Sequence, residues 1–249
     1  MTKQQPLAVL ADIHGNSLAL EAVLADAARR GLTRFANLGD TFYGPLDPAG
    51  TWSILKDMDM PTIRGNQDRI LIEDNPDQKN APALQAARTA LGNKGLTWLE
   101  TLPPTLVLNE TILLCHGTPE SDTTYLLEDV ATGLPLPRSC IDILDDLMPT
   151  ARDCTLVLTG HSHHAGMVSC QGRTIVNPGS VGLPAYDDDT PPHKMISGSP
   201  HARYAILTPD SAGWKTEFIE VEYDWEAASR LAQANKREDW ARWLLTGQA

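Results

Sequence analysis

The sequence predicts a mixed α/β domain in which two β-sheets pack face to face with helices on the outside. The first half of the chain alternates short apolar runs with helical patterns, as βαβ units do, whereas the second half is richer in strands. A length of 249 residues suits one domain with a large core, and neither an internal repeat nor a low-complexity tract divides the chain. We therefore expect a single domain over residues 1–249.

The first elements of this domain alternate regularly. An apolar run at Leu7–Ala11 predicts a strand, and Ser17–Arg30 has apolar residues at the spacing of a helix face. A second strand is expected at Phe35–Leu38. Asp47 and Pro48 are typical of a helix cap followed by a proline at the first helical position, so a helix should extend to about residue 58.

Further short apolar runs predict the remaining strands. One lies at Pro61–Arg64, and the pattern over residues 81–102 is then helical, with a break around Gly92–Gly95. Strands at Thr105–Leu108 and Thr111–Cys115 are separated by two residues that suit a tight hairpin, and Thr155–Thr159 follows as another strand.

Three segments have less regular patterns. Residues 118–150 form an insertion with a helix expected at Ser139–Leu147, and it is either a cap over the site or a surface connection. Leu183–His201 is expected to be irregular, with His193 and His201 solvated. The segment 226–245 is amphipathic and rich in tryptophan; we expect it to be helical and to pack on its own domain, with an oligomer contact as the alternative.

Composition restricts the function classes. The net charge of −12 argues against a general nucleic-acid binder, which needs a basic surface. No apolar run reaches the length of a membrane span, and Met1–Pro6 leads into the first strand without an apolar signal segment. The four cysteines show no Cys-x-x-Cys pairing, so we interpret them as reduced thiols in a cytoplasmic protein. They are Cys115, Cys140, Cys154 and Cys170.

Seven residues that can bind metal each follow one of the predicted strands. They are Asp12, His14, Asp40, Asn66, His116, His161 and His163. Each alone has an ordinary interpretation as a helix cap, a turn residue or a surface histidine. Seven donors at strand ends would instead gather at one edge of the molecule and form a site for two metal ions. Carboxylate, amide and imidazole donors without thiolate suit Mn, Fe, Ni or Zn.

The spacing of these donors also supports one site. Asp12 and His14 are two residues apart, and in an extended chain such residues project to the same side. His161 and His163 repeat the spacing. Glycines next to the donors allow the sharp turns and close backbone approaches that such loops need.

Five local strings carry a family resemblance. In chain order they are Ala11–Asn16, Leu38–Asp40, Arg64–Asp68, Cys115–Gly117 and Gly160–His163. Together they resemble the calcineurin-like metallophosphoesterases, specifically the small bacterial and archaeal phosphodiesterase branch. The resemblance covers nearly the whole chain, because Asn177–Gly182 and the closing strands also look like that branch. It implies a four-layer αββα sandwich of two mixed β-sheets flanked by helices.

The resemblance also implies roles for the donors. Asp12, His14 and His163 would hold the first metal, Asn66, His116 and His161 the second, and Asp40 would bridge both. The implied cofactors are two divalent transition ions, with Mn favoured and Fe, Ni, Co or Zn as alternatives. A hydroxide between the ions would attack phosphorus, so Asp40, Asn66 and His116 are the expected catalytic residues.

Four further residues are expected to contact the substrate: Arg64, Asn16, Gln67 and His164. Arg64 resembles a phosphate-clamping arginine, and its alternative is an ion pair with Asp68 or Glu73. Gln67 departs from the pattern, because many members of the superfamily have a histidine there that resembles a general acid. Glutamine cannot deliver a proton, although His164 could do so from another direction.

These features lead to a ranked set of functions. The first is hydrolysis of a small phosphodiester or cyclic nucleotide. A dinucleoside polyphosphate pyrophosphohydrolase and a phosphomonoesterase or protein phosphatase are the alternatives, and a non-catalytic scaffold ranks last because all seven donors are present. The expected partner is a small phosphate ester, and the expected state is a monomer or small homo-oligomer.

Overall fold

Strand β1 (Leu7–Leu10) is buried on both of its faces. Leu7 and Val9 pack into the layer between two sheets, whereas Ala8 and Leu10 pack against helices. Because successive side chains of a strand point to opposite faces, an uninterrupted apolar run needs an apolar partner on each side. The computed structural model describes residues 5–73, 81–148, 150–151, 153–211 and 213–249, so Met1–Gln4 of the expected N-terminal segment lie outside the described residues.

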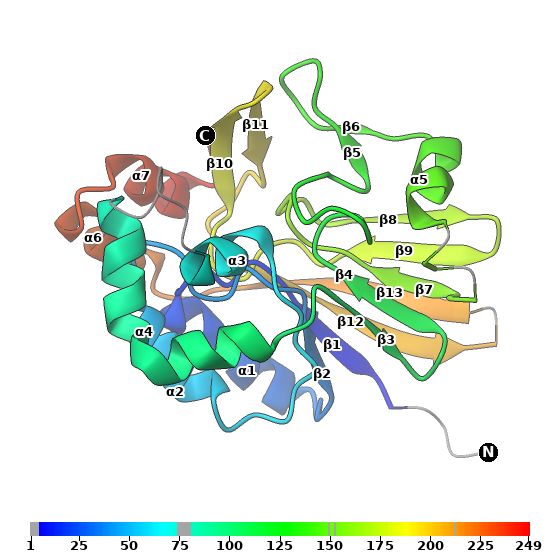
Figure 1. The fold of residues 1–249 in the computed structure, drawn as a ribbon, viewed down its shortest axis with the longest axis horizontal. Helices are drawn as coiled ribbons and strands as arrows, with labels where there is room; N and C mark the ends of the chain where they lie inside the picture. Colours follow the sequence, from blue (N-terminus) through cyan, green and yellow to red (C-terminus); the bar gives the residue numbers. More distant parts are fainter. Residues whose placement is uncertain (1–4, 74–80, 149, 152, 212) are drawn as a thin grey trace.

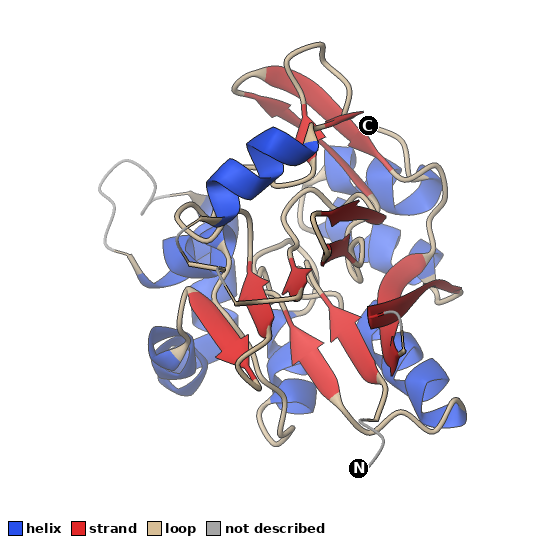
Figure 2. Ribbon diagram, turned by 90° about the vertical axis from the view of Figure 1, so that its right-hand side faces the viewer, coloured by secondary structure: helices blue, strands red, loops and turns tan. Residues whose placement is uncertain are grey.

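Two mixed sheets form the centre of the molecule (Figures 1 and 2). The first has the order β13-β12-β1-β2, with β1 parallel to β2 and antiparallel to β12. The second has the order β3-β4-β7-β9-β8, with β4, β7 and β9 parallel. Their bounds are β2 Phe35–Asn37, β3 Thr105–Leu108, β4 Ile112–Cys115, β7 Leu156–Leu158, β8 Gly166–Cys170, β9 Arg173–Asn177, β12 Ala202–Asp210 and β13 Gly213–Val221.

Helices cover the outer faces of both sheets, so the predicted αββα sandwich is confirmed. On the first sheet lie α1 (Ser17–Arg29), α2 (Pro48–Leu55), α3 (Asn66–Ile72) and α4 (Pro82–Thr101). On the second sheet lies α5 (Cys140–Leu147), at the opposite side of Figure 1. Asp47 caps α2 through the amide of Gly50, and α4 breaks at Gly92, where the sequence predicts a break.

The loops that leave the strands are tied to one another across the two sheets. The amide of Asp12 donates to Gly39 O, and that of Gly160 donates to His116 O. The amide of Gly182 donates to Asp12 O. These backbone bonds bring the ends of β1, β2, β4 and β7 together at one end of the molecule.

Two expectations about strands are wrong. Pro61–Arg64 is not a strand but a single bridge between Asn37 and Thr62, since Pro61 has no amide hydrogen to donate and the amide of Arg64 bonds Pro103 O. The expected irregular stretch after residue 183 contains a β-hairpin of β10 (Ala185–Asp189) and β11 (Pro192–Ile196). His193 in this hairpin is only 4% exposed, which corrects the expectation that it is solvated.

The insertion and the C-terminal segment both have internal structure. The insertion contains the short hairpin of β5 (Glu128–Asp129) and β6 (Leu136–Pro137) before α5; its residue 149 lies outside the described ranges. The C-terminal segment is two helices, α6 (Trp225–Ala234) and α7 (Glu238–Thr246), which pack on each other and on β10. Within the described ranges, no helix combines the length and apolar character needed to cross a membrane.

The interpretation of all four cysteines as reduced thiols is wrong. Cys140 on α5 and Cys170 on β8 form a disulfide, with their Cα atoms 5.6 Å apart. The 30-residue separation of this pair follows no sequence motif, and only the packing of α5 on the second sheet brings the two residues together. Cys115 and Cys154 are free and buried. The argument from reduced cysteines to a cytoplasmic location therefore no longer holds.

Candidate metal centre

Five of the seven predicted donors have a left-handed backbone. Asp12, His14, Asp40, His161 and His163 have φ between 51° and 68°. For residues other than glycine this conformation costs about 1–2 kcal/mol each, and it persists where the surroundings impose it, commonly at functional sites. Asp12 and His14 do share a side, but because both have left-handed backbones and not because the chain is extended.

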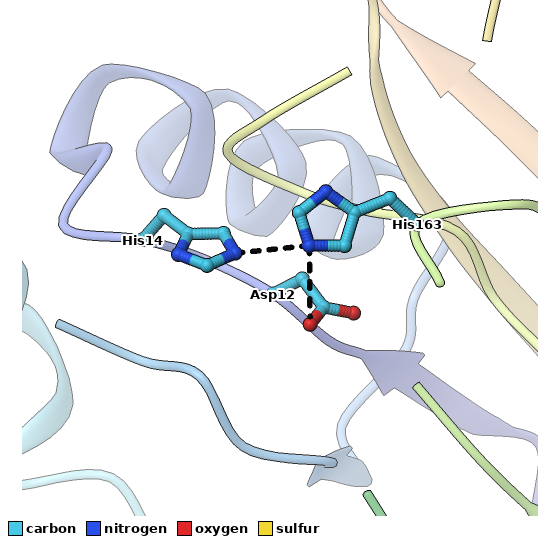
Figure 3. Close-up of side chains that lie close together, drawn as sticks. All are labelled: Asp12, His14 and His163. Carbon is cyan, nitrogen blue, oxygen red and sulfur yellow. Dashed lines mark hydrogen bonds and ion pairs between the residues drawn. The ribbon is translucent and has the colours of Figure 1, made fainter. Parts of the chain in front are cut away.

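The first group of donors consists of Asp12, His14 and His163, whose ligand atoms all lie within 4.8 Å of one another. Asp12 and His14 come from the loop after β1, and His163 comes from the loop after β7. Figure 3 shows the two imidazoles facing each other, with 3.0 Å between their Nε2 atoms, and the Asp12 carboxylate 3.4 Å from His163 Nε2.

The protonation pattern of this group suits a cation. His14 Nδ1 lies 3.0 Å from Tyr43 O, and His163 Nδ1 lies 2.8 Å from Leu183 O. A carbonyl can only accept, so each Nδ1 carries a hydrogen and each Nε2 is the nitrogen left to bind a cation. Within the described chain, buried Asp12 Oδ1 also has no hydrogen-bond partner. Converging lone pairs repel one another unless a positive ion binds between them.

The second group is built around Asp40, His116 and His161, whose ligand atoms also lie within 4.8 Å of one another. His116 Nε2 is 3.4 Å from Asp40 Oδ2 and 3.0 Å from Asn66 Oδ1. The same nitrogen is 3.9 Å from Asp12 Oδ1, so the two groups adjoin. The structure thus gathers all seven predicted donors, while their roles as ligands stay predictions.

Electrostatics favour the metal-binding protonation states of Asp40, His14 and His161, but they keep on His116 a proton that a metal would displace. Burial acts to raise the pKa of Asp40, but the neighbouring imidazoles of His116, His14 and His161 together outweigh it and lower the pKa well below its ordinary value. Burial and the neighbouring imidazoles lower the pKa of His14 and of His161 to about 4. Burial also acts to lower the pKa of His116, yet the Asp40 carboxylate raises it to about 10. At neutral pH the centre therefore offers an ionised Asp40 and neutral His14 and His161.

A family model described as the calcineurin-like phosphoesterase superfamily domain matches residues 6–197. The chain belongs to this superfamily. The resemblance of the five sequence strings to the calcineurin-like phosphoesterases is therefore confirmed.

Similar chains extend over the whole length of this phosphoesterase. An uncharacterized protein of Methanocaldococcus jannaschii is 27% identical, with 94% of each chain covered. A metallophosphoesterase from Sphaerobacter thermophilus is 24% identical with a TM-score of 0.72, covering 98% of this chain and 99% of that one. A hypothetical protein from Pyrococcus horikoshii is 22% identical with a TM-score of 0.74, covering 97% and 98%. The fold they share includes the C-terminal segment beyond residue 197.

Neighbouring side chains brace the loops of the phosphoesterase centre. Asp68 is fully buried and accepts hydrogen bonds from the amides of Thr41 and Gly65. Burial and the nearby Asp40 raise its pKa to about 7. It therefore joins the second and third donor loops and does not pair with Arg64 as the sequence suggested. A side chain at Gly65 would overlap the Asp40 carboxylate, so the loops approach closely only because this residue is glycine.

The Asn177–Gly182 string also acquires a structural role. Asn177 Nδ2 donates to Gly160 O at 2.7 Å, and Ser180 Oγ donates to Asp12 O at 2.8 Å. Both bonds end on loops that carry donors. This explains physically why the string accompanies the five donor motifs.

The predicted substrate contacts divide into two classes. Gln67 lines a cavity of about 240 Å³ next to the centre, called here the inner cavity, together with Asp40, Asn66 and His161. Within the described chain, neither Arg64 nor His164 lines this cavity or its larger neighbour. Burial and nearby Arg203 lower the pKa of His164. Of the four predicted contacts, Gln67 lines the inner cavity, and its contact with a substrate stays a prediction.

The expected substrate contact of Asn16 is corrected by the structure. Its Oδ1 caps α1 by accepting from the amide of Ala19, and its Nδ2 donates to Gly182 O and to the hydroxyl of Tyr223. Both polar ends of the side chain are therefore engaged in holding the donor loop. An asparagine just before a predicted helix was a sufficient sequence signal for this cap.

Several residues of the site have no signal in the sequence. Tyr125 from the insertion, Tyr186 from β10 and Trp240 from α7 line the inner cavity. Tyr125 stacks on His161 with ring centroids 4.7 Å apart, and Trp240 lies edge-on to His14 at 5.6 Å. These contacts arise from tertiary packing of the insertion, β10 and α7, which no local sequence pattern marks.

Proposed function

We propose that this phosphoesterase hydrolyses a small phosphodiester with two divalent metal ions bound at the seven-donor centre. The observation that carries the proposal is the convergence of two adjoining donor groups with unshared lone pairs and an unpartnered buried carboxylate oxygen, Asp12 Oδ1. Asp12, His14 and His163 would hold one ion, Asn66, His116 and His161 the other, and Asp40 both. Mn²⁺ suits this set of oxygen and imidazole donors.

The residues of the chain fix the geometry in which hydrolysis occurs. When bound, the two ions supply positive charge to the phosphoryl oxygens and an activated water. Asp40 is held in place by the amide of Gln67, which donates to Asp40 Oδ1 at 2.8 Å. His116 is oriented by Leu38 O, 2.8 Å from its Nδ1. Both groups are therefore preorganised on the protein side.

The inner cavity favours a diester over a monoester. Gln67 occupies the position from which a leaving group would be protonated, and an amide has no proton to give at neutral pH. Burial raises the pKa of the Tyr125 hydroxyl, which lines the same cavity, to about 12, so it is a weak acid. Substrates with activated leaving groups need this help least.

The surroundings of the centre disfavour polyphosphates. A second cavity of about 820 Å³, called here the outer cavity, shares Asn66 and His161 with the inner one. Its wall includes Asp129, Asp142 and Asp188, and the guanidinium of Arg138 in that wall is already bonded to Asp146. Among the residues that the structure describes, the wall of the outer cavity has no lysine or arginine besides Arg138, so additional phosphates there would face carboxylates and a substrate with an uncharged arm fits better.

The test is a substrate panel with metal analysis. Metal-free protein is reconstituted with Mn, Ni, Co, Mg or Zn and assayed on bis(4-nitrophenyl) phosphate, 4-nitrophenyl phosphate, a 2′,3′-cyclic nucleotide and diadenosine tetraphosphate. We expect two ions per chain, fastest turnover on a diester, and recovery of activity when metal is returned after chelation. Saturation at one ion, or preference for a monoester, would contradict the proposal.

A further inference from the structure

His161 differs from the other three imidazoles of the centre in how it is held. His14, His116 and His163 each direct Nδ1 to a backbone carbonyl at 2.8–3.0 Å. In the part of the chain that the structure describes, no group is hydrogen-bonded to either ring nitrogen of His161. Its ring orientation must therefore be fixed in another way.

Two tyrosines from distant segments supply that support. The Tyr125 ring lies flat on the His161 ring, 4.7 Å between centroids with 25° between planes. Tyr186 donates its hydroxyl to His161 O at 3.1 Å. The two hydroxyls are 2.8 Å apart, so ring and backbone of His161 are restrained by one connected pair.

His193 anchors the pair from the far side. Its Nε2 lies 2.9 Å from the Tyr125 hydroxyl, and its Nδ1 lies 2.7 Å from Pro191 O. The chain of bonds thus runs from β11 through the insertion and β10 to the donor loop after β7. In Figure 1 the β10–β11 and β5–β6 hairpins stand at the same end of the molecule.

Counting protons gives this chain a direction. The only hydroxyl hydrogen of Tyr186 goes to His161 O, so the hydrogen between the tyrosines belongs to Tyr125, and His193 Nε2 must donate to Tyr125. Bonds aligned in one direction reinforce one another.

We propose that Tyr125, Tyr186 and His193 are positioning residues that fix His161 from outside the donor set and thereby set the affinity of the second metal position. This inference rests on the proposed function, because it requires a metal at that position. It assigns the insertion and the β10–β11 hairpin a task in building the centre. At the first metal position His14 and His163 have their own carbonyl anchors, and Tyr186 contacts His163 through its ring, which Tyr186→Phe retains. The first position should therefore not depend on the hydroxyl groups.

The experiment measures stepwise Mn²⁺ affinity of the metal-free protein by titration calorimetry. Tyr125→Phe and His193→Leu should each lower the Mn²⁺ affinity of the second metal position about 10-fold, the low end of the effect of residues that hold metal ligands in place. The Mn²⁺ affinity of the first position should stay within about twofold of wild type. His193→Gln keeps an N–H that can donate to Tyr125, so it should restore affinity to within about twofold of wild type. The double variant Tyr125→Phe with Tyr186→Phe should lose less than the sum of the single losses.

Tyr204→Phe is the matched control. It removes a buried hydroxyl that donates to Asp26 Oδ2 at 2.8 Å, away from the centre, and should lower the melting temperature without changing either metal affinity. If Tyr125→Phe also lowers the melting temperature without changing either metal affinity, the tyrosine pair only packs the structure and the inference is wrong. Two bound ions without diester hydrolysis would refute the proposed function while leaving the affinity result valid. A wild-type protein that binds only one ion would overturn both.

Discussion

The two donor groups of the centre differ in how firmly their side chains are held. In the first group both imidazoles are anchored to carbonyls and packed against aromatic rings, His14 on Trp240 and His163 on Tyr186. In the second group only His116 has a carbonyl anchor, Asn66 sits on the first residue of a short helix, and His161 is held by Tyr125. Both imidazoles of the first position thus have a carbonyl anchor as well as an aromatic contact, while His161 of the second position has the aromatic contact without the carbonyl anchor.

The change with the largest expected effect is Asp40→Asn, because it should weaken metal binding at both donor groups and not at one of them. Asp40 is adjacent to His116, and the imidazoles of His14 and His161 also lower its pKa, so its charge serves both positions. We expect both ions to bind weakly and turnover to fall about 10³-fold, equivalent to several kcal/mol of lost stabilisation. Metal content and turnover are measured together, with circular dichroism as the control for folding.

Near wild-type turnover of Asp40→Asn with two ions still bound would show that the carboxylate is only part of the loop structure. The fold itself should persist, because Asp40 lies in a loop and the sheet layers have their own apolar cores. Some loss of melting temperature is expected in the presence of metal, since weaker binding stabilises the native state less.

A second pair of variants separates the groups. His14→Ala removes one ligand of the first metal position, so it should weaken metal binding there about 100-fold and leave the second position occupied. His161→Ala removes one ligand of the second position and should have the opposite effect. Calorimetric titration with Mn²⁺ distinguishes the two positions. Equal loss of both ions in either variant would mean that the groups form one indivisible site.

A smaller effect is expected at Gln67, which lines the inner cavity beside the second group. Gln67→His introduces a group that can protonate a leaving alkoxide, so turnover of an alkyl phosphomonoester should rise about 10²-fold, at the low end for general acid catalysis. Hydrolysis of bis(4-nitrophenyl) phosphate should change little, because its leaving group needs no proton. An equal change on both substrates would indicate altered binding instead.

The smallest effect concerns Glu128 in the insertion, near the second group. Burial raises its pKa from 4.5 to about 7, so between these values the folded protein keeps a proton that the unfolded chain releases. The free energy of unfolding contributed by this group is therefore full below pH 4.5 and is lost as the pH rises through 7. Glu128→Gln should make the metal-free protein more stable at pH 8 by on the order of 1–2 kcal/mol and change little at pH 4.5. Denaturant titrations at both pH values check it, and a difference independent of pH would contradict it.

The sequence predicts the donors of both groups better than the side chains that support them, for a physical reason. Donors such as Asp12 and His14 are encoded locally, by an apolar strand followed by a donor and a glycine, and strand ends meet wherever the sheets form. The fold class follows from the same local patterns. The left-handed backbone of these donors is not encoded locally, because bonds from other loops, such as the one from the amide of His14 to Asp40 O, impose it.

The supports of the second group escape prediction because they are tertiary. Helix α3 has seven residues and no side-chain cap, so its pattern is too short to recognise. The hairpin around His193 is rich in proline and aspartate and reads as a loop, yet its strands pair with each other and β10 packs on α7. Tyr125 likewise has no local pattern that marks it as a neighbour of His161.

The left-handed donor positions imply a trade-off between stability and activity. Glycine adopts this backbone without strain, so at Asp12, His14, Asp40, His161 or His163 a glycine would relieve about 1 kcal/mol or more of conformational cost in the metal-free fold. It would also remove a donor. Backbone strain alone would therefore favour glycine at these positions, but His14→Gly also removes a buried imidazole that is anchored to Tyr43 O and packed against Trp240. The melting temperature of this variant should fall further below that of the wild type with metal than without it. The metal centre is therefore retained although its left-handed donor residues lower the stability of the metal-free fold.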